Sequence, residues 1–233
     1  MTEKEWLVSG DPYTMWLNNP KLISYRKAIL FAVVIMEDIS MAFDESLDRP
    51  NFSKLINLAQ KIAKVGKIDR TDRKTIAKLR HYFQDAMSTY LEDNQFQAIG
   101  ELINLLIKKG SLAVGMIGIL QDICNVVILD TGAGYRDALN SLRGHQCQIL
   151  RDIFGNPFQP PPAINPVWFR WSDGAIIKIA RVIYDEHGFD RLPILADALE
   201  DAGCTDAAIL EHLRGPGPHV RGCWALDLLL GKE

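Results

Sequence analysis

Apolar residues recur at three- and four-residue steps through the first half of the chain, which is the spacing of helices that bury one face. Four such stretches follow one another, at residues 22–43, 55–65, 76–91 and 99–107. Asp11-Pro12 combines a capping side chain with a proline that fits the first helical turn. Thr71 or Asp72 is expected to cap the third stretch. The pattern therefore predicts consecutive helices, with turns between them.

Residues 112–150 are ambiguous by pattern. The run Val126-Val127-Ile128-Leu129 has strand propensity, but no second segment is available to pair with it. Because a lone strand leaves its backbone hydrogen-bonding groups unsatisfied, helix is the better interpretation.

The segment 155–167 breaks the pattern, since its consecutive prolines exclude regular structure. After this predicted linker, helical spacing returns over residues 173–186, 192–202, 205–213 and 223–230, with Gly203 and Gly215 at expected helix ends and Thr205 or Asp206 at an expected start. The sequence thus predicts an all-α protein, an irregular multi-helix bundle with a proline-rich linker before a C-terminal helical segment. It divides into parts 1–150 and 151–233, or folds as one continuous domain.

The amino-acid composition indicates the general class of protein. Of 233 residues, 48% are hydrophobic and 24% charged, which suits a globular fold, and the net charge of −3 provides no general attraction to nucleic acid. The longest apolar run, 110–129, contains Gln121, Asp122 and Asn125, which would be costly in a bilayer. The chain lacks a signal-like start, and its four cysteines form no CxxC pair. These features indicate a cytoplasmic protein with no membrane partner and reduced thiols.

The C-terminal third and the first residues contain long sequence motifs that resemble those of one protein family. These motifs are MTEKEWL at the start, RDIFGNPF at 151–158, LPILADALEDAGC at 192–204 and HVRGCW at 219–224. They are similar to an uncharacterised bacterial family that is abundant in planctomycetes. The resemblance covers about ten residues at the start and about 80 at the end. It implies a bacterial helical protein and transfers no catalytic residue.

Three other features favour ordinary packing or solvation over a site. Asp130-Thr131-Gly132 resembles the aspartic protease motif but lacks the sheet and the second carboxylate that those enzymes need. A basic stretch at 61–80 has no aromatic residue for base stacking before Tyr82, so a solvated surface and no nucleic-acid partner are predicted. An aromatic cluster near the linker is expected to pack on the core; it comprises Trp168, Phe169 and Trp171.

One cluster near the C-terminus has chemical potential. Cys204, His212, His219 and Cys223 are side-chain types that bind zinc, although their spacing matches no standard zinc finger. Arg214, His219 and Arg221 surround a Gly-Pro-Gly-Pro loop before a helix start, which suits an anion. A thiolate at Cys223, stabilised by that helix start and by Arg221, is also predicted. The alternative is that the cysteines are buried apolar residues and that the charged groups cap helix ends.

Two functions follow as hypotheses. The absence of any strong catalytic motif favours a helical interaction or scaffold protein that binds another protein. The alternative is a small metal-binding or thiol-dependent enzyme or module that uses the C-terminal cluster, with zinc as the candidate cofactor.

Overall fold

The computed structural model describes residues 1–18, 24–40, 49–65, 67–89, 103 and 135–232. About 72% of these residues are helical, and they include no strand, so the all-α prediction is confirmed. The predictions for Val126–Leu129 and Asp130, and most of the predicted helix at 99–107, lie outside the described residues. The chain divides into two compact units. The first, here called the central unit, comprises residue 1 and residues 8–147; the C-terminal unit comprises residues 2–7 and 148–233.

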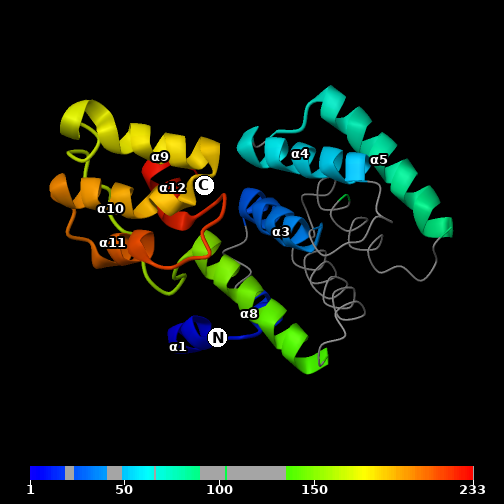
Figure 1. The fold of residues 1–233 in the computed structure, drawn as a ribbon, viewed down its shortest axis with the longest axis horizontal. Helices are drawn as coiled ribbons and strands as arrows, with labels where there is room; N and C mark the ends of the chain where they lie inside the picture. The colour runs from blue at the N-terminus through cyan, green and yellow to red at the C-terminus, as the bar shows by residue number, and fades with distance from the viewer. Residues whose placement is uncertain (19–23, 41–48, 66, 90–102, 104–134, 233) are drawn as a thin grey trace. The chain divides into compact units, whose positions relative to one another are not determined.

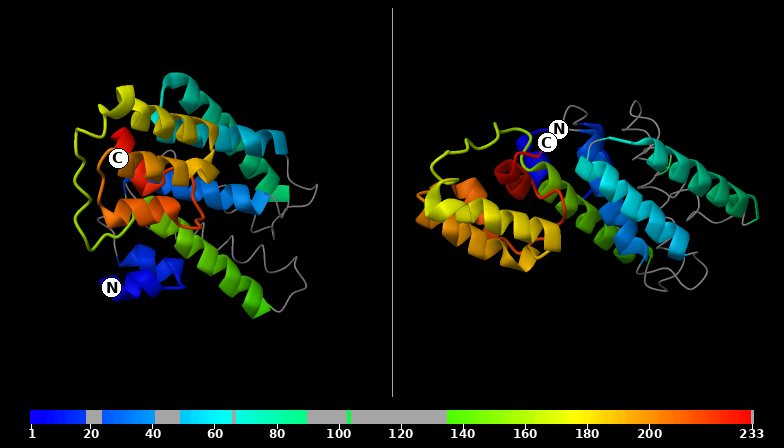
Figure 2. Two further views of the ribbon diagram at one scale, coloured as in Figure 1. Left: turned by 60° about the vertical axis from the view of Figure 1, so that its left-hand side comes forward. Right: turned by 90° about the horizontal axis from the view of Figure 1, so that it is seen from above.

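Three helices provide most of the described core of the central unit: α3 (Tyr25–Ser40), α4 (Arg49–Val65) and α5 (Arg70–Thr89). Helix α3 is buried on all sides from Ala28 to Met36 and packs along α4 (Figures 1 and 2). Helix α4 buries a single face that includes Leu55 and Ile62, as the sequence spacing predicts. Burying each such side chain contributes about 1.5–3 kcal/mol, so packing rather than intrinsic propensity holds these helices together.

The predicted capping residue is confirmed at one helix start, whereas a different residue caps the helix at another. Asp11 caps α2 (Pro12–Leu17) as predicted, accepting hydrogen bonds from the backbone N–H groups of Tyr13 and Thr14. Helix α5 was expected to start at Thr71 or Asp72, but Asp69 is the capping residue. Asp69 and Asp72 each accept a hydrogen bond from the other's backbone N–H, at 2.7 and 3.1 Å, which is a reciprocal capping arrangement.

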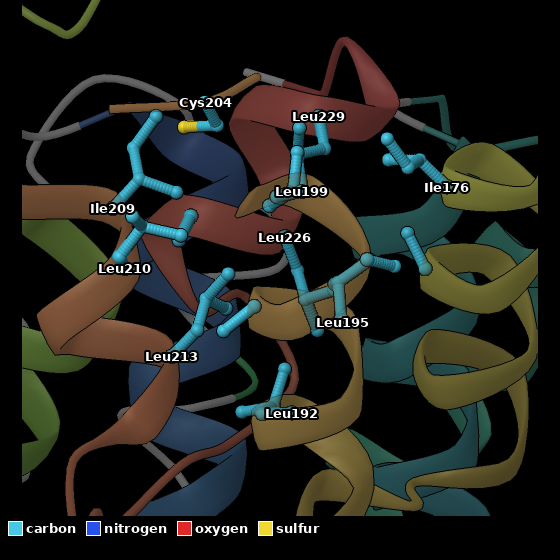
Figure 3. Packing of buried hydrophobic residues seen from close by; sticks show 14 of the residues in the cluster. Ile176, Leu192, Leu195, Leu199, Cys204, Ile209, Leu210, Leu213, Leu226 and Leu229 are labelled. Atoms are coloured by element: carbon cyan, nitrogen blue, oxygen red, sulfur yellow. The ribbon is translucent and has the colours of Figure 1, made fainter. Parts of the chain in front are cut away.

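The C-terminal unit encloses one apolar core between four helices (Figure 1): α9 (Ala175–Glu186), α10 (Leu192–Asp201), α11 (Ala207–Arg214) and α12 (Trp224–Leu230). Asp206 caps α11 through the backbone N–H of Ile209, as predicted. Figure 3 shows leucine and isoleucine side chains from these helices filling the core, with Cys204 among them. Trp168 lies in this core, while Phe169 and Trp171 pack against it, which agrees with the predicted packing role of the aromatic cluster.

The proline-rich segment does not separate the two units. The boundary falls at Cys147/Gln148, inside α8 (Tyr135–Phe154), and the prolines lie within the C-terminal unit. They lead from α8 to a short 3₁₀ segment, Trp171–Gly174, before α9. A second 3₁₀ segment, Phe189–Arg191, connects α9 to α10. The first helix, α1 (Glu3–Val8), also contributes to the C-terminal unit through residues 2–7. This unit is therefore built from two stretches that are distant in sequence.

Within the described ranges, none of the helices has both the length and the apolar character needed to cross a bilayer.

Candidate metal centre

A buried carboxylate lies at the centre of the candidate site. Asp152, in the last turn of α8, is 3% exposed. Its Oδ2 accepts a 2.9 Å hydrogen bond from the backbone N–H of Val220, and its Oδ1 lies 2.8 Å from His219 Nδ1 and 3.2 Å from His212 Nε2. Burial alone would raise the pKa of Asp152, but hydrogen bonds from His212 and His219 outweigh it and hold this pKa below its ordinary value. The carboxylate is therefore ionised.

His219 is held from both sides of its ring. Nδ1 faces Asp152, while Nε2 lies 3.3 Å from the carbonyl oxygen of Gly215. Because neither oxygen can donate a hydrogen bond, this geometry favours the doubly protonated imidazolium form of His219. Burial would lower the pKa of His219, but the hydrogen bond and charge of Asp152 outweigh burial and raise it.

The loop between α11 and α12 fixes the position of His219. Gly217 has a φ of +82°, a conformation that side chains disfavour. A Cβ atom there would lie 2.9 Å from the backbone nitrogen of His219 and 3.3 Å from its ring atom Cδ2. Glycine is therefore needed at this position for the loop to present the His219 ring to Asp152.

His212 approaches from the last turn of α11. Its Nε2 lies 3.2 Å from Cys223 Sγ as well as 3.2 Å from Asp152 Oδ1. The ring packs edge-on against His219, with centroids 5.0 Å apart, and lies 4.9 Å from the ring of Trp224. Its side chain is 19% exposed, so it is the most accessible side chain of the four.

Cys223 caps α12 and has no exposed surface. Burial raises the pKa of this thiol well above its ordinary value, and the negative charge of Asp152 raises it further. Both effects disfavour the predicted thiolate at Cys223 in the absence of a metal ion. Arg221 instead places its guanidinium carbon 5.4 Å from the centroid of the Tyr184 ring.

The four side chains offer one ligand atom each, and these atoms all lie within 4.8 Å of one another. Zinc bonds of about 2.0–2.3 Å in a tetrahedron would place neighbouring ligand atoms about 3.3–3.6 Å apart. The separations of 2.8 and 3.2 Å lie just below that range, and no two ligand atoms are more than 4.8 Å apart, so movements on the order of 1 Å would bring them to tetrahedral spacing. The group can hold a metal ion.

The structure thus brings together three of the predicted zinc ligands, His212, His219 and Cys223, and adds Asp152. Cys204 is not part of the group, because it is 1% exposed inside the apolar core, where burial raises its pKa (Figure 3). Asp152 was missed because it is 60 residues from the nearest of the other three. The available signal was a charged residue between Ile149 and Ile153, on the apolar face of a helix.

The residues predicted to bind an anion are separated. Arg214 forms ion pairs with Asp197 at 2.7 Å and Glu200 at 2.5 Å, both on α10. Arg221 contacts Tyr184 on α9, and His219 contacts Asp152. Each of the three therefore has a different neighbour, and anion binding stays a prediction.

Comparisons of the chain with known protein families, with curated proteins and with solved structures found no match.

Proposed function

We propose that the C-terminal unit is a metal-binding module that holds one Zn²⁺ through Asp152, His212, His219 and Cys223. The observation that carries the proposal is the convergence of one carboxylate, two imidazoles and one thiol within 4.8 Å in a buried site. Imidazole and thiol ligands favour zinc over magnesium or calcium, which prefer oxygen ligands. A bound zinc ion would replace the proton of His219 and that of Cys223.

The role of the metal follows from the number of ligands. Four protein ligands complete a tetrahedron, whereas catalytic zinc sites keep one position for water or substrate. The ligands come from α8, α11, the loop after α11 and the start of α12. Zinc would therefore connect these segments and stabilise the unit. A structural metal of this kind corresponds to the metal-binding module that the sequence analysis gives as the alternative to an interaction protein.

Thiol catalysis is a weaker candidate. In a Cys–His–Asp relay, the thiol and the carboxylate face different nitrogens of the histidine ring. Here the same atom, His212 Nε2, lies 3.2 Å from both Cys223 Sγ and Asp152 Oδ1. The thiol is also fully buried. The arrangement suits convergence on a metal better than relay of a proton.

Titration with Co²⁺ tests the proposal directly. Protein stripped with a chelator should bind one equivalent, with visible absorption bands of tetrahedral cobalt and a sulfur-to-cobalt charge-transfer band, and zinc should displace both. Cys223→Ser should remove the charge-transfer band. Cys204→Ser is the matched control, because it changes another buried cysteine and should leave the spectrum intact. Absence of stoichiometric binding, or loss of the band in Cys204→Ser alone, would contradict the proposal.

A further inference from the structure

Helix α1 reaches the part of α8 that carries Asp152, although about 145 residues separate them in sequence. The backbone carbonyl of Trp6 accepts two hydrogen bonds from Arg151, from Nε at 3.2 Å and from Nη2 at 2.9 Å. The indole Nε1 of Trp6 donates a 3.1 Å hydrogen bond to the carbonyl of Gly155. Trp6 is 2% exposed. Trp6 therefore contacts the chain on both sides of Asp152. It binds the side chain of Arg151, which precedes Asp152, and the backbone of Gly155, which follows it.

A second set of contacts continues from Gly155 to the metal ligands. Gly155 has a φ of +68°, and a Cβ atom there would lie 3.1–3.4 Å from three atoms of the Trp224 ring. The Trp224 ring in turn lies 4.9 Å from the His212 ring. Trp6, Gly155, Trp224 and His212 thus form a continuous series of contacts from α1 to the site.

The docking of α1 has further support at its first turn. Glu3 Oε1 accepts hydrogen bonds from the side-chain amides of Asn156 at 2.6 Å and Gln159 at 2.8 Å. Thr2 and Glu5 cap the helix reciprocally, with bonds of 2.7 and 3.3 Å between side chain and backbone. Helix α1 is too short to persist alone in water, so these contacts define its position.

From these contacts we infer that α1 is a positioning element of the metal centre, and that its docking controls how long the metal is retained. The inference rests on the proposed zinc site. Trp6 orients Asp152 through Arg151 and Gly155, and it orients His212 through Gly155 and Trp224. Contacts outside the ligands that fix ligand orientation typically change metal affinity by about 10- to 100-fold. Undocking of α1 would loosen two of the four ligands together.

The test measures the rate at which the full-length, zinc-loaded chain releases zinc to an excess of a chromogenic chelator. Trp6→Ala should release zinc at least about 10-fold faster than the wild type. Trp6→Phe, which keeps an aromatic ring but lacks the indole N–H, should give an intermediate rate. Leu7→Ala is the matched control on the same helix, since Leu7 is 53% exposed, and it should release zinc at the wild-type rate.

A spectroscopic measurement separates positioning from general destabilisation. At saturating Co²⁺ and unchanged helical circular dichroism, Trp6→Ala should show altered visible bands, because the ligand geometry has changed. If Trp6→Ala fails to fold, Glu3→Ala removes only two hydrogen bonds at the rim and should still accelerate release by about 2- to 3-fold.

The outcomes distinguish the two proposals. If the wild type binds no zinc, the proposed function fails. If the wild type binds zinc but the folded Trp6 variants, or Glu3→Ala in their place, release it at the wild-type rate, the positioning role of α1 is overturned while the zinc site stands.

Discussion

Asp72 in the central unit and Asp152 in the C-terminal unit are both nearly buried, and the contrast between these two aspartates shows what distinguishes a candidate site from a helix cap. Asp72 in the central unit has a side chain that is 5% exposed, and Asp152 in the C-terminal unit has one that is 2% exposed. Asp72 is satisfied locally, by the backbone N–H of Asp69 and the ammonium group of Lys61 at 2.6 Å. Burial of a carboxylate is therefore not in itself evidence of a site.

Asp152 differs in the chemistry and the origin of its partners. Its side-chain neighbours are imidazoles that arrive from 60 and 67 residues away, and a thiol completes the group. Lysine is a poor metal ligand at neutral pH because its amine is protonated, whereas imidazole and thiol bind transition metals. The partners, not the carboxylate, make the C-terminal cluster a group that could hold a metal ion.

The largest expected effect comes from replacing the carboxylate of Asp152 with an amide. Asp152→Asn should weaken zinc binding by at least about 100-fold, because it removes a charged ligand. It should also destabilise the metal-free protein by about 3 kcal/mol, because the His219 imidazolium loses its counter-charge. Zinc titration and urea unfolding in chelator measure the two effects.

Asp72→Asn is the paired control for this prediction. It should cost about 1 kcal/mol or less, as a weakened helix cap does, and should leave zinc affinity unchanged. Equal loss of zinc binding in both variants would remove the distinction between the two aspartates.

The pH dependence of stability should reverse when zinc is bound. The pKa of Asp152 is lowered on folding, so its contribution is present above the ordinary carboxyl value of about 4 and is lost as pH falls through the folded pKa. The pKa of His219 is raised, so its contribution is complete below about pH 6.5 and is lost as pH rises through the folded pKa. The contribution of this pair to the metal-free protein should therefore be largest between about pH 4 and 6.5.

Zinc competes with the protons of His219 and Cys223, so its stabilising effect should increase from pH 6 to pH 8. Tm measured across this range, with zinc and with chelator, compares the two forms. His219→Gln isolates the contribution of the pair, because it removes the titrating group. Parallel pH profiles for the zinc-loaded and chelated wild type would refute this prediction.

A smaller effect is expected at the loop that presents His219. Gly217→Ala should lower stability by about 1–2 kcal/mol and weaken zinc binding, because the new methyl group would meet His219 in a backbone conformation that favours glycine. Gly10→Ala is the control, since its added Cβ would have no neighbour within 4 Å. Calorimetry of both variants, with and without zinc, tests whether the loop geometry matters to the site.

The smallest effect is expected at Arg214. Its partners Asp197 and Glu200 are exposed, and surface ion pairs contribute little. Arg214→Ala should therefore change Tm only slightly and leave zinc affinity unaltered. A loss of phosphate binding in this variant would instead support the sequence-based anion prediction.

The sequence predicted well where the signals were local. Asp11-Pro12 and Asp206 mark helix starts through their own neighbouring backbone, and both predictions are confirmed. Three metal-site residues lie between 212 and 223, so their density was visible in the sequence. Asp152 could not be assigned in this way, because its pairing with His219 depends on how α8 meets the loop after α11. Cys204 was grouped by residue type, yet the apolar residues around it place it in the core.

The C-terminal unit is made up of two stretches that are distant in sequence, residues 2–7 and 148–233. The intervening residues 8–147 belong to the central unit.

The separation of these two stretches along the sequence imposes an order on biosynthesis. Trp6 leaves the ribosome before its partners Arg151 and Gly155 exist, and they follow 145 and 149 residues later. At about 5–20 residues per second, the delay is on the order of 7–30 s, which is long compared with the formation of single helices. The central unit therefore has time to fold before the Gly155 carbonyl, which accepts the hydrogen bond of the Trp6 indole, has been synthesised. If the C-terminal unit binds zinc as proposed, the metal enters only after synthesis of the chain is nearly complete.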